Sequence, residues 1–199
     1  MTNHKLQILL GSASPRRRAL LAGLDLPFTA INIDADETYP AGLKAGDIPY
    51  YISRAKAQAY APQLQPDQLL ITADTIVWLD GQMLGKPHDE ADAITMLRRL
   101  SGKTHQVYTA VTFANLQSPI SNLQLETIVD KTDVTFKDLF DEEIRHYVTQ
   151  YRPLDKAGAY GVQEWIGYIA CTAMNGSYFN VMGFPVHRVY EQLKNRGIV

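Results

Sequence analysis

An apolar run that passes through a Gly-Ser-Ala-Ser-Pro turn into three arginines constrains this chain more than any other stretch. The run over residues 6–10 is typical of a buried strand, and Leu20, Leu21 and Leu24 are then spaced for one apolar helix face. Ser14 followed by Pro15 is a strong helix start, because the serine oxygen caps free N–H groups and proline already has a helical φ. The sequence therefore predicts a strand, a tight loop and a helix in succession.

The same loop gathers groups that bind phosphate. Backbone N–H groups at a helix N-terminus attract anions, and an arginine binds phosphate through two parallel hydrogen bonds. The alternative is an ordinary strand-to-helix turn whose arginines, Arg16 to Arg18, lie in water. The Gly-Ser-x-Ser-Pro sequence before them favours the phosphate cradle.

Composition excludes several classes of protein. The 199 residues, 46% hydrophobic and 20% charged, suit one domain or two closely packed lobes. A net charge of −2 argues against a general nucleic-acid or membrane surface, so any anion site must be local. The single cysteine, Cys171, fits a reducing compartment and rules out a cysteine zinc cluster. No apolar stretch approaches the length of a membrane span, and we expect a cytoplasmic protein.

Strand and helix patterns alternate along the rest of the chain. Strands are expected at 28–33, 69–73, 76–79, 82–84, 105–114 and 123–136, with a polar loop between the last two. Helices are expected around 51–59, 89–100, 141–151 and 185–195, and glycines after 151 favour loops and short strands. These elements predict a mixed α/β fold: a twisted central sheet flanked by helices, in two lobes with a cleft between them.

Polar side chains at the ends of these apolar elements are candidates for a site. Asp74 ends the strand 69–73, Glu37 follows the strand 28–33, and Lys56 and Lys86 can reach the same cleft. Lysines hold phosphates, whereas carboxylates hold a metal through oxygen and can accept a proton from water. Taken singly, each residue could also be a strand-end turn, a solvated loop charge or the polar face of a helix. Their shared position favours a metal-assisted reaction on a polyphosphate.

Six stretches together resemble one known family. Ser12-x-Ser14-Pro15-Arg16-Arg17-x-x-Leu20-Leu21 resembles the opening motif of the Maf family. The later motifs of that family are resembled, in the same order, by Ala73–Thr75, Leu84–Pro87, Leu100–Val107, Asp155–Gln163 and Asn180–Pro185. The resemblance covers nearly the whole chain. It implies a single Maf-like domain over residues 1–199, with a two-lobed fold like that of the Maf and inosine-triphosphatase proteins.

This resemblance also implies an activity. Maf proteins split the α–β bond of nucleoside triphosphates, releasing the monophosphate and diphosphate, with a divalent metal such as Mg²⁺ or Mn²⁺. It implies that Asp74 accepts the proton of the attacking water and lies with Glu37 near the metal. Ser12, Arg17, Lys56 and Lys86 would bind the phosphates. The resemblance further implies a cytoplasmic homodimer.

Three positions separate branches of the family. Arg16, Thr75 and Gln163 match the branch that favours dTTP and UTP. The resemblance to this branch also implies a house-cleaning role on modified pyrimidine nucleotides. Glu164 and Trp165 depart from the pattern, because many relatives place a glycine directly after the glutamine. Two alternatives stay open: a nucleotide-sensing protein that affects cell division without cleaving, and a pyrophosphatase for modified purine triphosphates. Diphosphate release from a panel of triphosphates separates all three.

The remaining polar and aromatic residues have plainer interpretations. The five histidines do not cluster at ligand spacing. His105 is expected to be structural, and the other four are expected on the surface: His4, His88, His146 and His187. Lys156 is either a cation of the cleft or a partner of Asp155. Three tyrosines are expected in the core or the cleft wall: Tyr160, Tyr168 and Tyr178.

Overall fold

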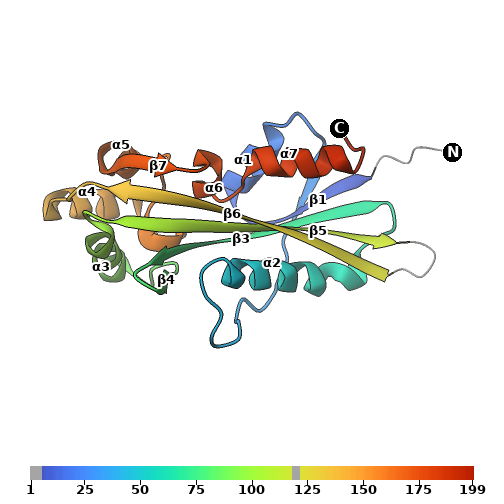
Figure 1. The fold of residues 1–199 in the computed structure, drawn as a ribbon, viewed down its shortest axis with the longest axis horizontal. Helices are drawn as coiled ribbons and strands as arrows, with labels where there is room; N and C mark the ends of the chain where they lie inside the picture. The colour runs from blue at the N-terminus through green and yellow to red at the C-terminus, as the bar shows by residue number, and fades with distance from the viewer. Residues whose placement is uncertain (1–5, 118–121) are drawn as a thin grey trace.

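The computed structural model describes residues 6–117 and 122–199, and it is built on a mixed seven-stranded sheet with helices on both faces (Figure 1). The strand order is β2-β1-β3-β5-β6-β7, and β4 pairs with β3. The strands are β1 (Gln7–Gly11), β2 (Phe28–Ile31), β3 (Gln68–Leu79), β4 (Gln82–Leu84), β5 (Thr104–Gln117), β6 (Asn122–Phe136) and β7 (Cys171–Asn175). The α-helices are α1 (Pro15–Ala22), α2 (Asp47–Tyr60), α3 (Glu90–Leu100), α4 (Asp141–Tyr151), α5 (Trp165–Ala170), α6 (Tyr178–Val181) and α7 (Val186–Asn195).

Near-continuous apolar runs in β1 and β3 are explained by helices on both sides of the sheet. Successive side chains of a strand point to opposite faces. Leu69 and Ile71 therefore pack with residues of α1 and α7, whereas Leu70 packs with Ala57 of α2. Figure 1 shows α2 on one face and α1 and α7 on the other. A strand buried on both faces has no need of polar alternation.

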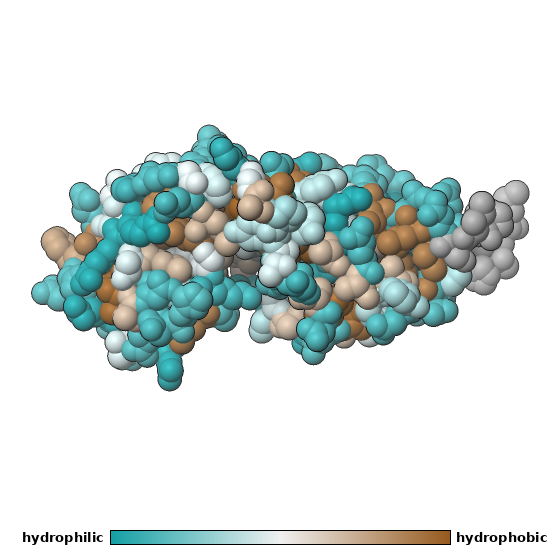
Figure 2. Space-filling model, turned by 90° about the horizontal axis from the view of Figure 1, so that it is seen from below, coloured by the Kyte–Doolittle hydropathy of each residue, from teal (hydrophilic) through white to brown (hydrophobic). Residues whose placement is uncertain are grey.

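A separate apolar cluster lies at the other end of the long strands. Leu97 of α3, Tyr147 of α4 and Ile166 of α5 belong to it, together with the far ends of β3 and β5. β5 and β6 run along the molecule between the two ends (Figure 1). In the space-filling view the surface is hollowed between these ends (Figure 2). The expected two lobes and cleft correspond to this arrangement.

β3 corrects one expectation and explains where the cleft opens. A strand end at Asp74-Thr75 and a separate strand over 76–79 were expected, but β3 is continuous from Gln68 to Leu79. It is continuous because β5 pairs with it from Leu70 to Trp78. On its other edge β1 pairs only as far as Thr72, and β4 begins to pair at Val77. In the described part of the chain, residues 73–76 therefore have no paired strand on this edge, which leaves a gap between the end of β1 and the start of the β4 pairing.

The other elements follow the sequence pattern, with two exceptions: α2 and the segment after 151. α2 begins at Asp47, four residues before the helix expected around 51–59. The helix at 141–151 is confirmed, and those expected at 89–100 and 185–195 differ from α3 and α7 by one residue at the N-terminus. β5 and β6 are longer than expected and β2 is shorter. The glycine-rich segment after 151 forms two short helices, α5 and α6, in addition to the expected short strand. His4 and the loop between β5 and β6 lie outside the described residues.

No helix in the described ranges is both long enough and apolar enough to cross a membrane.

Candidate active site

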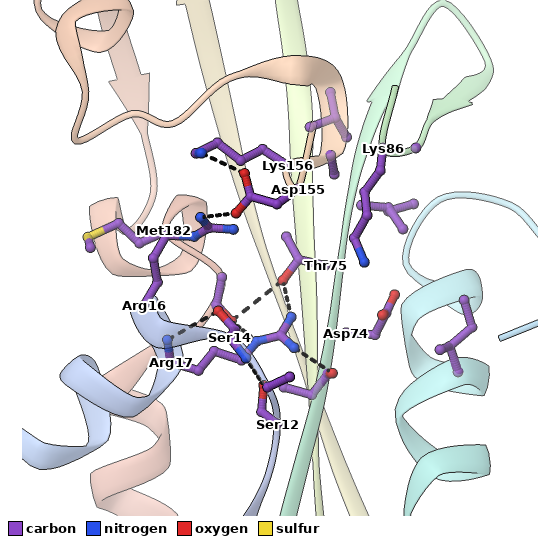
Figure 3. A pocket seen from close by; sticks show the side chains of 18 of the residues that line it. Ser12, Ser14, Arg16, Arg17, Asp74, Thr75, Lys86, Asp155, Lys156 and Met182 are labelled. Atoms are coloured by element: carbon purple, nitrogen blue, oxygen red, sulfur yellow. Dashed lines mark hydrogen bonds and ion pairs between the residues drawn. The ribbon is translucent and has the colours of Figure 1, made fainter. Parts of the chain in front are cut away.

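The gap along β3 opens into a cleft of about 620 Å³. Its walls come from the turn after β1, the start of α1, the middle of α2, the loop after β4 and the segment before α5. Every residue that the sequence singles out for the site lines this cleft: Ser12, Arg16, Arg17, Glu37, Lys56, Asp74, Thr75, Lys86 and Gln163. Several of them are seen from close by in Figure 3. The structure therefore brings together groups that lie up to about 150 positions apart.

Arg17 fills the gap between β1 and β4. Its NH1 donates to the carbonyl oxygen of Ala73 at 2.9 Å, and its Nε donates to that of Gly183 at 2.8 Å. Its NH2 donates to the hydroxyl of Thr75 at 3.0 Å. Arg17 thus satisfies a strand carbonyl that has no neighbouring strand there, and it ties α1 to β3 and to the segment after α6. Two of its five N–H groups remain for a ligand in the cleft.

The turn before Arg17 has the cap that the sequence predicts. The Ser14 hydroxyl accepts a hydrogen bond from the Arg17 backbone N–H at 3.4 Å. The hydroxyl of Ser12, which is buried, accepts one from the N–H of Ser14 at 3.2 Å. Arg18 does not line the cleft, and its Nε donates to the carbonyl oxygen of Ser12. Of the three arginines, Arg16 and Arg17 therefore face the cleft.

Lys56 joins the two predicted carboxylates. Its ammonium lies 2.9 Å from Asp74 Oδ1 and 2.9 Å from Glu37 Oε1. The side chains of Lys56 and Asp74 are only 12% and 13% exposed, whereas Glu37 is half exposed at 53%. A lysine on α2, an aspartate on β3 and a glutamate from the loop after β2 therefore form one compact charged group.

The protein environment shifts the pKa values of the two carboxyl groups in opposite directions. Burial raises the pKa of Asp74 above its ordinary value, although the charges of Lys56 and Arg17 oppose it. Burial acts the same way on Glu37, but the hydrogen bond and charge of Lys56 and the charge of Lys86 hold its pKa below the usual range. Two neighbouring acids with separated pKa values can take different roles, one as base and one as a permanent charge.

Lys86 supplies a further cation beside this group. It lies in the loop after β4, is exposed, and extends toward Asp74 in Figure 3. An exposed ammonium at the mouth of a cleft is free to follow an incoming anion, because its flexible stem carries three donors.

A second charged group lies at the other end of the cleft. Asp155 accepts from Arg16 NH1 at 2.9 Å and from Lys156 Nζ at 2.7 Å, one carboxylate oxygen for each (Figure 3). These two hydrogen bonds lower the pKa of Asp155, although burial opposes them. Lys156 thus proves to be both a partner of Asp155 and a residue of the cleft wall. The sequence alone left these two roles of Lys156 open, because an adjacent Asp-Lys pair has no spacing signal of its own.

The other two residues expected to read the base, Thr75 and Gln163, also line the cleft. Thr75 lines the cleft, but its hydroxyl contacts Arg17 and lies 3.0 Å from that of Thr109. Gln163 lines the cleft from the turn before α5. Tyr160 lines it as well and is buried, whereas the other two tyrosines, Tyr168 and Tyr178, are exposed on α5 and α6 and so lie outside the core and the cleft wall.

His105 is structural, as expected. Its ring is buried, and its Nε2 lies 2.8 Å from the hydroxyl of Tyr160. The ring packs edge-on against Phe136 and Tyr160. His105 therefore supports the cleft wall from behind.

The carboxylates fit a magnesium or manganese ion that is shared with a substrate. Within the described ranges no cluster of three or more His, Cys, Asp or Glu side chains could hold a metal by itself. Glu37 and Asp74 nevertheless contact the same ammonium and present hard oxygen donors to the cleft. Mg²⁺ is commonly bound through one or two carboxylates, with the remaining ligands from substrate phosphates and water.

Comparison with known proteins agrees with the geometry. A family model described as "Maf-like protein" matches residues 7–196. A protein of Bacteroides thetaiotaomicron named dTTP/UTP pyrophosphatase is 51% identical over 96% of both chains. Proteins with the same name from Phocaeicola vulgatus and Porphyromonas gingivalis are 52% and 50% identical, over 96% of each relative and 96% and 97% of this chain.

Proposed function

The chain belongs to the Maf family, and on that premise we propose that it is a pyrophosphatase acting on dTTP and UTP. It hydrolyses the α–β phosphoanhydride bond, and the products are the nucleoside monophosphate and diphosphate. One observation carries the proposal. A largely buried Asp74 is held by Lys56 next to Glu37 and Lys86 in a cleft, within a chain about half identical to proteins that carry this name.

Asp74 is the residue that accepts the proton of the attacking water. Lys56 donates to its Oδ1 and so fixes the carboxylate, which leaves Oδ2 as the accepting oxygen. A raised pKa makes the carboxylate a stronger base, and general bases work best when their pKa lies near the working pH. A residue in mid-strand is also held rigidly, which keeps the accepting oxygen in place during the attack.

The cations of the cleft bind the triphosphate and screen its charge. The attacked phosphorus is surrounded by negative oxygens, so positive groups must neutralise them before water can approach. Lys86 and Lys56 lie beside Asp74, and Arg17 keeps two N–H groups for the same purpose. Ser12 and the N-terminal end of α1, where the helix dipole attracts anions, complete the phosphate cradle.

Asp74 and Glu37 are the residues that hold the divalent metal. Such an ion would supply Lewis-acid chemistry, which stabilises negative charge on phosphate oxygens.

Gln163, Thr75 and Arg16 select the base. An amide both donates and accepts hydrogen bonds, as the edge of uracil or thymine requires, and a pocket of this kind rejects bases that cannot pair with it. Replacing Gln163 by Glu removes the donor, so the preference for UTP over GTP should fall. An unchanged ratio of kcat/KM values would count against this residue.

We place the protein in the cytoplasm as a homodimer that removes normal or modified pyrimidine triphosphates. Its single cysteine and near-neutral charge favour this setting over an extracellular, membrane or nucleic-acid-bound one.

The test is diphosphate release from a panel of normal and modified triphosphates, with and without Mg²⁺. We expect release from dTTP and UTP, and a loss of about 10²–10⁴-fold in kcat for Asp74→Asn. Nucleotide binding without any release would favour a sensor that does not cleave. Faster release from modified purine triphosphates would favour the purine alternative.

A further inference from the structure

Glu164 is held at both of its carboxylate oxygens, although it lies behind the cleft wall. Its Oε1 lies 3.1 Å from the ammonium of Lys156. Its Oε2 accepts a hydrogen bond from the hydroxyl of Tyr147, a fully buried residue of α4. The Tyr147 hydroxyl also accepts from the N–H of Gly161 at 3.0 Å. One tyrosine therefore fixes both ends of the turn 161–164, the turn that carries Gln163.

Lys156 connects this turn to the cleft. Its side chain is only 9% exposed, and its ammonium lies between the carboxylates of Glu164 and Asp155. Asp155 uses its other oxygen to hold Arg16. The order of contacts is thus Tyr147, Glu164, Lys156, Asp155 and Arg16, running from the interior to the cleft.

The charges along this series alternate and sum to zero. Lys156 is buried, and a buried ammonium must be paired to remain charged. Because Lys156 has two carboxylates beside it, Asp155 can pair with Arg16 as well as with Lys156. If Glu164 were replaced by a neutral residue, Asp155 would be the only carboxylate paired with Lys156. The ion pair between Asp155 and Arg16 would then weaken.

We infer that Glu164 is a positioning residue for nucleotide selection: it acts through Lys156 and Asp155 to hold Arg16, and it fixes the turn that presents Gln163. The inference rests on the proposed function, since Arg16 and Gln163 are the residues that select the base there. Glu164 itself does not line the cleft. Asp74, Lys56 and Lys86 belong to the other charged group, so Glu164 is not expected to affect the chemical step.

Glu164→Gln tests this inference because it keeps the size of the side chain and removes its charge. We expect KM for UTP to rise about tenfold, within the range of couplings between residues of one ion-pair network. We expect kcat to stay within about twofold, because the catalytic carboxylate is untouched. The preference for UTP over GTP should fall with it. Glu142→Gln, at an exposed position of α4, is the matched control and should leave KM unchanged.

A double-mutant cycle separates positioning from a general loss of structure. In a Lys156→Met background, adding Glu164→Gln should change KM by no more than about twofold. The ammonium on which the charge of Glu164 acts is then gone, and the glutamine oxygen can still accept from the Tyr147 hydroxyl. Equal effects of Glu164→Gln with and without Lys156 would overturn the inference. Asp155→Asn provides an independent arm at an exposed position, and an unchanged KM for UTP there would also overturn it.

Failure of the proposed function has a different signature. A wild-type protein that releases no diphosphate from UTP would contradict the activity itself. An active wild type whose Glu164→Gln variant keeps its KM and its base preference would contradict only the role of Glu164.

Discussion

His105 makes the stability of the cleft wall depend on pH. Burial lowers its pKa from 6.5 to about 4, and its Nε2 lies 2.8 Å from the Tyr160 hydroxyl. A histidine with a depressed pKa stabilises the fold fully above its unfolded pKa of 6.5, and this contribution is lost as the pH falls toward 4. From these two pKa values, the free energy of unfolding should fall by about 2 kcal/mol between pH 7.5 and 5.0 through this residue alone.

Urea unfolding of the wild type and of His105→Gln at both pH values measures this term. The substitution is expected to destabilise the protein at pH 7.5, because it removes the ring that packs against Phe136 and Tyr160. The difference between the two proteins should shrink by about 2 kcal/mol at pH 5.0, since only the wild type has this group to protonate. His187→Gln, at an exposed position of α7, is the control. A constant difference at the two pH values would refute the reasoning.

Three further changes probe the site. In Arg17→Lys, a single ammonium cannot reach all three acceptors of the guanidinium, so we expect a loss of about 3 kcal/mol in the free energy of unfolding, measured in urea. An unchanged stability would contradict the role of these three hydrogen bonds. Gly183→Ala places a side chain at a φ of 100° with its Cβ 3.2 Å from the Thr75 hydroxyl. It should lower the free energy of unfolding by about 2 kcal/mol and raise KM for UTP. Lys56→Met removes a charge that lowers the pKa of Asp74, so the acidic limb of the pH–rate profile should move to higher pH; a limb that stays in place would remove Asp74 as the titrating group.

The fold was largely predictable because its signals are local. Periodicity and caps give the helices α3, α4 and α7 almost to the residue, and apolar runs give the core strands. The continuity of β3 was not predictable in the same way. Asp74 has low strand preference. It stays in the strand because β5 pairs opposite it at Ala110, and the pairing continues at Thr75 opposite Thr109.

The members of the site were easier to predict than their contacts. Asp74, Lys56 and Lys86 stand out because they interrupt or border apolar elements and match a family motif. Two of the three acceptors of Arg17 are backbone carbonyl groups, one of them in Gly183, 166 positions away, and no residue type marks these two. Glu164 stood out only as a departure from the family pattern, because its two partners come from separate segments that only the fold brings together.

The central claim is that Asp74 directs water to the phosphorus nearest the nucleoside. Hydrolysis of UTP in ¹⁸O-labelled water tests it directly, because the label marks the phosphorus that water attacks. We expect label in UMP and none in diphosphate, with the reaction slowed by orders of magnitude in Asp74→Asn. Label in diphosphate, release of orthophosphate, or near-normal turnover by the variant would contradict it.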